Sequence, residues 1–184
     1  MEQLRLFIAL PFDPGLARKI NKQFLGLNLP WTAIKTVLPE QMHVTLRFLG
    51  AVPLDKLPEL ISALEQVKKT SVDGIDLTVE KAVASPERHP EVISLKIAEQ
   101  ESLLILHKNI EDALYQSGLA HRENRQYKPH LTLGRIKQTI SPDDLGALKN
   151  WLIKEQCTVS NFDLMQSELT PRGPIYTVLQ SFDL

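Results

Sequence analysis

The chain has 184 residues, 43% of them hydrophobic and 23% charged, which suits one globular domain with a single substantial core. Its net charge of -1 argues against a nucleic-acid coat protein, and no apolar run is long enough to cross a membrane. The single cysteine, Cys157, excludes an internal disulfide and a multi-cysteine zinc site.

The predicted elements mix helices with adjacent pairs of strands. We expect a strand over 5–10, a helix from Asp13, which serves as its N-cap, to Leu25, extended pieces within 32–38 and a strand over 43–50. A helix over 55–68 follows, then strands over 75–84 and 91–98, a helix over 101–116 and a strand over 129–136. A helix over 141–151 and strands over 158–169 and 175–182 complete the chain.

Adjacent strand pairs favour antiparallel sheets in an α+β fold, and no low-complexity linker divides residues 1–184 into separate domains. The N-terminus lacks a signal-peptide pattern, so we predict a cytoplasmic protein without a membrane partner.

The stretch HVTLRFLG, residues 43–50, alternates like a half-buried strand, in which successive side chains point to opposite faces. This alternation predicts that Val44, Leu46 and Phe48 enter the core. The opposite face would carry an imidazole, a hydroxyl and a guanidinium, from His43, Thr45 and Arg47. Such a face is either solvated or one wall of a functional site.

The tetrapeptide HVTL at 43–46 is repeated as HLTL at 130–133, in the other half of the chain. Each copy places its histidine and threonine on one strand face, roughly 6.5–7 Å apart along the strand. The repeat predicts two similar lobes that each contribute one histidine strand to a shared cleft. The second copy lies in a basic segment, residues 121–137, which has five Lys or Arg residues and one Glu.

Two imidazoles across a cleft can act as an acid and base pair near neutral pH, since one removes a proton from water and the other protonates a departing alkoxide. Hydroxyl and guanidinium groups can hold the non-bridging oxygens of a phosphate. The pattern therefore suits cleavage of a phosphodiester. A zinc site would need a further histidine, cysteine or carboxylate in place of the threonine, so we predict neither a metal nor another cofactor.

Three further side chains have two readings each. Arg47 shares the face of His43 and Thr45 by alternation, and it either reaches a substrate or forms a salt bridge. Arg135 falls on the face opposite His130 and Thr132 unless Gly134 marks a bulge that turns it toward them. Tyr127 either stacks on a base or packs beside Pro129.

The paired H-x-T-x motifs resemble the signature of the two-histidine phosphoesterases. The segments RLFIAL, PEQMHVTLRFLG, YKPHLTLGR and SELTPRGPIYTVL resemble one branch in particular, the RNA 2′,3′-cyclic phosphodiesterase family, also called 2′-5′ RNA ligases. The resemblance covers nearly the full chain. It implies a pseudo-symmetric two-lobed fold in which antiparallel sheets line a central cleft and helices pack outside.

The resemblance also implies metal-independent hydrolysis of an RNA-terminal 2′,3′-cyclic phosphate to a 2′-phosphomonoester. Carried over to matching positions, His43 would protonate the leaving 3′ oxygen and His130 would activate water. The phosphate would be contacted by Thr45, Thr132 and Arg135. The implied partners are RNA ends, tRNA fragments among them, and we expect a monomer.

Other functions remain open at this point. The histidines could bind an RNA end or nucleotide phosphate without turnover, or the enzyme could act on a small cyclic nucleotide metabolite. The family's ligase name records a reverse 2′-5′ joining reaction, and the sequence does not say whether that direction matters.

Overall fold

The computed structural model describes residues 2–67, 74–171 and 173–184. Its helices are α1 (Pro14–Leu25), α2 (Leu57–Glu65), α3 (Glu101–Gln116) and the short α4 (Gly146–Asn150). The strands are β1 (Gln3–Pro11), β2 (Ile34–Thr36), β3 (His43–Pro53), β4 (Ile75–Ser85), β5 (Val92–Ile97), β6 (His130–Ile136), β7 (Gln156–Val159), β8 (Asn161–Thr170) and β9 (Gly173–Asp183). None of these described helices has the length and apolar character needed to cross a membrane.

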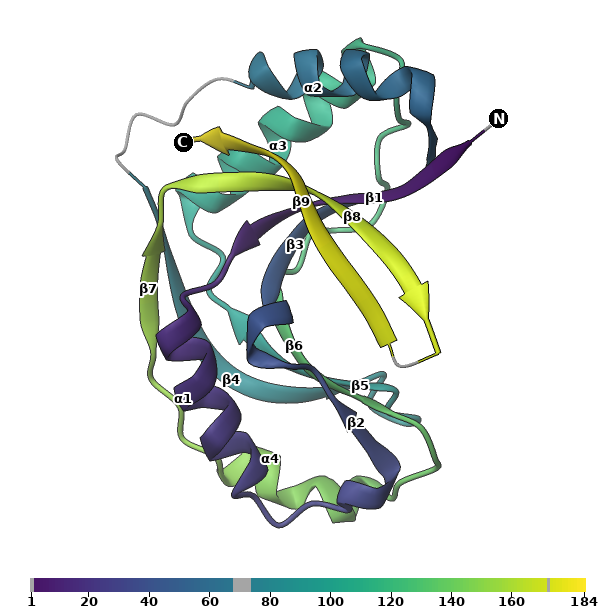
Figure 1. Cartoon of the computed structure of the whole chain (residues 1–184). Helices are drawn as coiled ribbons and strands as arrows, with labels where there is room; N and C mark the ends of the chain where they lie inside the picture. The colour runs from purple at the N-terminus through teal and green to yellow at the C-terminus, as the bar shows by residue number, and fades with distance from the viewer. Residues whose placement is uncertain (1, 68–73, 172) are drawn as a thin grey trace.

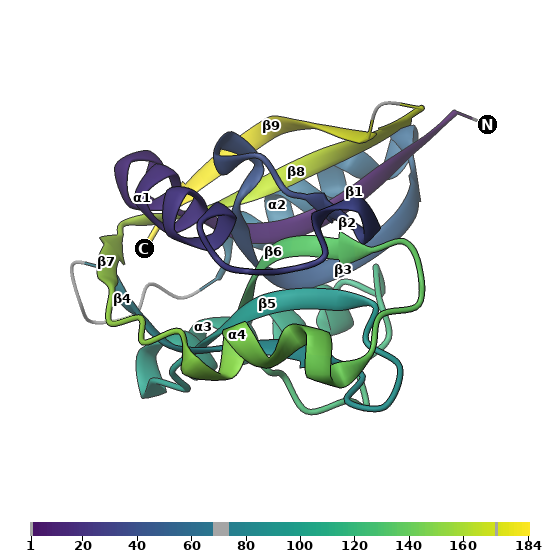
Figure 2. The ribbon, with the colours of Figure 1, turned by 90° about the horizontal axis from the view of Figure 1, so that it is seen from below.

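The strands form a curled sheet in the order β7-β4-β5-β6-β3-β1-β8-β9, with β2 paired to β6. Every recorded pairing is antiparallel. Helices α2 and α3 lie together at one end of the molecule, and α1 and α4 lie at the other (Figure 1). The curl places the β8–β9 hairpin and strands β4 and β5 on opposite sides of the β3–β6 junction (Figure 2). The predicted α+β class with antiparallel sheets is confirmed.

The two halves of the sheet meet where β3 pairs with β6. Within the described chain, the recorded register between these strands is a single pair, Val44 with Leu131. These are the second residues of the two tetrapeptides, and both side chains are fully buried in one hydrophobic cluster. The repeated motifs therefore lie side by side on neighbouring antiparallel strands, and their second residues are both buried in the core.

Most predicted elements are confirmed, and the differences have local causes. The Asp13 side chain accepts a hydrogen bond from the Leu16 amide and caps α1 as expected. The helix predicted over 55–68 begins with a 3-10 turn, Leu54–Lys56, and α2 ends at Glu65. Its predicted last residue, Lys68, lies outside the described residues.

Two further segments depart from expectation. The helix predicted over 141–151 is divided into a 3-10 helix, Pro142–Leu145, and α4. Part of the extended region over 32–38 forms a 3-10 turn, Trp31–Ala33, before β2 begins. The long strand predicted over 158–169 is two strands, because β7 pairs with β4 whereas β8 pairs with β1 and β9.

The junction predicts a stability effect for Leu131→Ala. Truncating this fully buried side chain removes contacts on both sides of the strand junction and leaves a cavity, so the free energy of unfolding should fall by about 2–5 kcal/mol. Chemical denaturation measures the loss. Leu152→Ala is the control, because Leu152 is 91% exposed and its truncation should cost little. Equal effects of the two variants would contradict the proposed importance of the junction.

Candidate active site

The β3–β6 junction brings the two histidines to one face of the sheet. Extending the Val44–Leu131 register by one residue in each direction places His43 opposite Thr132, and Thr45 opposite His130. Because side chains alternate along a strand, these four point away from the core pair. The sheet thus carries two matched His–Thr pairs related by an approximate twofold axis.

Each histidine ring is oriented by the main chain two residues before it. His43 Nδ1 lies 2.8 Å from the carbonyl oxygen of Gln41, and His130 Nδ1 lies 2.9 Å from that of Lys128. A carbonyl oxygen only accepts hydrogen bonds, so each Nδ1 donates its proton. In the neutral rings, Nε2 is therefore the nitrogen left to exchange a proton with a substrate.

The two rings have different surroundings. His43 packs on Phe7 at a ring-centroid distance of 4.9 Å and meets the Tyr176 ring edge-on at 5.2 Å. Burial among these groups lowers the pKa of His43 below its ordinary value, the hydrogen bond to Gln41 opposes the shift, and the nearby His130 adds to it. His130, by contrast, is exposed to solvent.

A β-bulge in β3 changes where Arg47 points. Ala9 pairs with Thr45 and Ile8 pairs with Arg47, so Leu46 is an extra residue in β3. Ile8 belongs to the hydrophobic core, and Arg47 consequently lies on the core side, toward α3. The alternation that placed Arg47 beside His43 and Thr45 is wrong for this reason.

A second bulge, in β6, has the opposite effect on Arg135. Ser94 pairs with Thr132, and Val92 pairs with Arg135. Thr132 and Arg135 are three positions apart on β6, whereas Val92 and Ser94 are only two positions apart on β5, so β6 has one extra residue. The register shift falls at Leu133. Since Val92 and Ser94 share a strand face, Arg135 shares the face of Thr132. The structure thus has the bulge that the sequence left open.

The bulges also revise the aromatic residues of the site. Phe48 pairs with Phe7 on the cleft face and is 59% exposed, so it does not enter the core as alternation predicted. Tyr127 is half-buried, its ring stacks on His107 at 4.0 Å, and its hydroxyl donates to the Thr45 carbonyl. His107 covers one face of Tyr127, whereas Phe48 presents an exposed ring to the same pocket.

Sequence reasoning missed both Phe48 and Tyr176 as site residues. Tyr176 lies in the GPIY segment, where no periodicity distinguishes it from a structural aromatic. Phe48 could have been found from the motif repeat alone, because it occupies the same position after His43 that Arg135 occupies after His130.

A pocket of about 500 Å³ runs from His130 between β3 and the loop that precedes β6. Its charged and polar lining includes Thr45, Ser94, Lys96, Arg125 and Lys128. Among the described residues, no three His, Cys, Asp or Glu side chains are grouped as metal ligands would be. His130 lines this pocket, whereas His43 lines a separate hollow with Gln41 and Tyr176. The volume of the first pocket is within the range of small-molecule binding sites.

Paired His–Thr strands at the centre of a two-lobed antiparallel sheet are the arrangement of a two-histidine phosphoesterase. The family comparison is more specific. The chain belongs to the 2′-5′ RNA ligase superfamily, whose family model matches residues 33–171.

Several relatives match over nearly their full length. A protein of Archaeoglobus fulgidus named RNA 2′,3′-cyclic phosphodiesterase is 31% identical, covering 98% of this chain and 100% of its own. The Thermus thermophilus protein of that name is 32% identical, over 98% and 90% respectively. The crystal structure of TT0787 of Thermus thermophilus superposes with a TM-score of 0.81 at 26% identity, over 98% of both chains. The structure of Escherichia coli LigT complexed with 3′-AMP has a TM-score of 0.79 at 23% identity, over 100% and 99%, and supports the fold.

The packing around His43 predicts its titration. Tyr176→Ala should hydrate the His43 ring and raise its pKa back toward about 6.5, because burial is the largest cause of the lowered value. NMR titration of the ring protons measures this. Ile175→Ala is the matched control, since Ile175 is the neighbouring residue and is 53% exposed. A His43 pKa that is unchanged in Tyr176→Ala would contradict the assignment of burial as the cause.

Proposed function

We propose that this protein is an RNA 2′,3′-cyclic phosphodiesterase that opens a terminal cyclic phosphate to a 2′-phosphomonoester. The observation that carries the proposal is the pair of histidines on one sheet face. Each has Nδ1 held by a main-chain carbonyl, and neither Nε2 has a hydrogen-bond partner among the described residues. The names of the relatives point to the same reaction. A protein that merely bound phosphate would have no need for two proton-exchanging groups.

In the proposed reaction His130 gains one proton and His43 loses one, so the total charge on the two rings does not change. Nε2 of neutral His130 takes a proton from water, and the resulting hydroxide attacks phosphorus. The bond between phosphorus and the 3′ oxygen breaks, and Nε2–H of protonated His43 gives its proton to that oxygen. The product carries a 2′-phosphate and a 3′-hydroxyl, and proton exchange with solvent restores both rings.

In this proposal the phosphate oxygens are held by the Thr45 and Thr132 hydroxyls and by Arg135. Exposed Phe48 offers a surface on which the terminal base can stack. Arg47 and Tyr127 also line the pocket, but their polar groups are engaged with the protein itself, so we expect them to shape the pocket and not to hold the phosphate. We expect a metal-independent cytoplasmic monomer that acts on RNA ends such as those of tRNA fragments.

The deciding experiment uses an RNA oligonucleotide with a defined 2′,3′-cyclic end. The protein should convert it to the 2′-phosphate, and His43→Ala or His130→Ala should each reduce turnover by about 10²–10⁴-fold, because each removes one acid–base group. Chromatography against 2′- and 3′-phosphate standards identifies the product. Circular dichroism of the variants verifies that they fold.

The controls separate the alternative functions. Tight binding with an unchanged cyclic end would favour a binding module, and faster turnover of a mononucleotide 2′,3′-cyclic phosphate would favour a small metabolite. Turnover should survive EDTA. Loss of activity in EDTA that zinc restores would instead indicate a metal-dependent reaction.

The lowered pKa of His43 predicts a specific pH dependence. As general acid, His43 must be protonated, so kcat/KM should fall as pH rises through the pKa of the free protein, which lies below the ordinary value near 6.5. A bound phosphate anion next to the ring favours the charged form and raises this pKa. The alkaline limb of kcat should therefore lie at higher pH than that of kcat/KM. Coinciding limbs would argue against His43 as the acid.

A further inference from the structure

The loop over 121–128 forms one wall of the 500 Å³ pocket, yet it has little structure of its own to hold it there. In the described part of the chain, these residues make no main-chain hydrogen bond to another main-chain group. The wall is held by side-chain contacts. Arg122 of the loop pairs with Asp112 of α3 at 2.7 Å, and Arg47 of β3 contacts two further loop residues.

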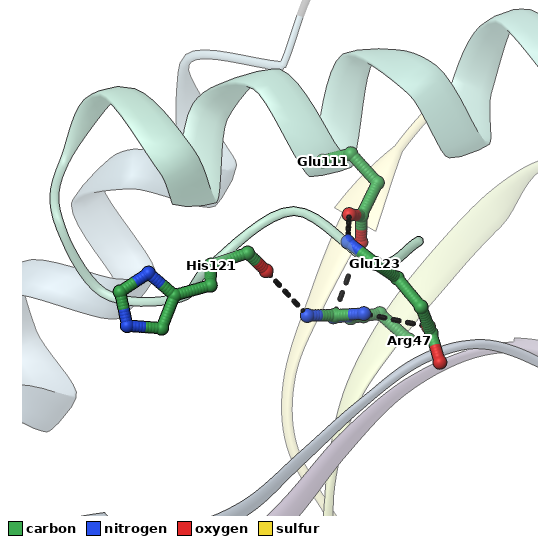
Figure 3. Close-up of polar contacts among 4 residues, drawn as sticks. All are labelled: Arg47, Glu111, His121 and Glu123. Carbon is green, nitrogen blue, oxygen red and sulfur yellow. Dashed lines mark hydrogen bonds and ion pairs between the residues drawn. The ribbon is translucent and has the colours of Figure 1, made fainter. Parts of the chain in front are cut away.

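Arg47 reaches the loop from β3 (Figure 3). Its Nη2 donates to the carbonyl oxygen of His121 at 2.7 Å, and its Nη1 donates to Glu123 Oε2 at 2.6 Å. Nε lies 3.1 Å from Glu111 Oε1 on α3, an ion pair without hydrogen-bond alignment. The other oxygen of Glu111 accepts from the Glu123 amide at 3.0 Å. One guanidinium thus ties β3 and α3 to the loop.

These charges are held with little exposure to water. The side chains of Arg47 and Glu111 are 11% and 10% exposed, whereas that of Glu123 is 46% exposed. A buried charge is costly unless it is paired, and a planar guanidinium with several donors can pair with several acceptors at once. The loop end at His121 and Glu123 is therefore bound more tightly than a surface ion pair would bind it.

A second anchor lies on the same strand. Tyr127 donates to the carbonyl of Thr45, two residues before Arg47, and stacks on His107 of α3. The end of the loop is held independently, since the Pro129 carbonyl accepts from the Ile97 amide at 3.0 Å. His130 therefore stays in place even if the earlier part of the loop is released.

We propose that Arg47 is a positioning residue for RNA-end binding, which holds the 121–128 loop as a preformed wall of the nucleotide pocket. The proposal rests on the proposed function. A preformed wall spares the substrate the cost of ordering the loop, so its loss weakens binding of the nucleotide. Of the reacting centre, Lys128 belongs to the loop, since its carbonyl orients His130. Lys128 lies between the anchors at Tyr127 and Pro129, so we expect the centre to keep its geometry when the Arg47 contacts are removed.

The test uses the double variant Arg47→Met/Glu111→Gln. Removing both charges avoids a buried unpaired carboxylate, so the protein keeps its fold even where Arg47→Met alone does not. Affinity is measured for an RNA oligonucleotide with a 2′-phosphate end, and KM and kcat for the cyclic-ended RNA. Inorganic phosphate, which occupies the reacting centre alone, is measured as a competitive inhibitor.

The expected result is a weakening of RNA affinity and a rise in KM by about tenfold, with kcat and the phosphate inhibition constant changed less than about threefold. Lys56→Met is the control, because it removes the exposed Lys56–Glu59 ion pair, which involves no residue of the loop. It should behave as the wild type.

Unchanged RNA affinity in the folded double variant would overturn the proposal. A parallel loss of phosphate binding would also overturn it, because that result indicates general damage to the site. Absence of turnover by the wild-type protein would refute the proposed phosphodiesterase instead, and the RNA-binding comparison would still test the role of Arg47.

Discussion

The site depends on the buried contact between Val44 and Leu131. In the register of the described strands, this pair joins β3 to β6 and aligns the tetrapeptides in antiparallel fashion, so that each histidine lies opposite the threonine of the other copy. Because the pair lies in the core, the polar residues on either side of it must emerge together on the opposite face. The hydrophobic contact that stabilises the junction is thus the same contact that assembles the polar groups.

The sequence predicted this assembly because it depends on period-two alternation next to the junction, and alternation is visible in the residues. The prediction from alternation was wrong for Arg47 and Phe48, which follow a bulge in β3. Leu46 and Leu133, the last residues of the two tetrapeptides, are both bulged, and a bulge is defined by the partner strand rather than by the bulged residue. Gly134 was the available signal. A Cβ there would lie 3.1 Å from Ile34 Cγ2 and 3.2 Å from the Lys35 carbonyl oxygen, so the close approach of β2 favours glycine.

Once the bulges are included, the two lobes match better than the sequence indicated. The residue five positions after each histidine returns to the cleft, and this residue is Phe48 in one lobe and Arg135 in the other. The residue four positions after each histidine faces away from the cleft. Arg47 and Gly134 occupy equivalent positions, four residues after their histidines. Gly134 leaves room for β2, so the second lobe has no side chain that corresponds to Arg47.

The same symmetry explains why the two histidines differ. Repeated motifs set equal main-chain partners for both rings, but what covers each ring comes from strands that are not equivalent. Phe7 and Tyr176 cover His43, while His130 opens toward solvent and the loop that Arg47 holds. Burial then biases one imidazole toward the neutral form until an anion arrives, whereas the exposed ring stays in contact with water. A duplicated strand therefore becomes an unequal acid–base pair through its neighbours, which no property of the tetrapeptide itself could specify.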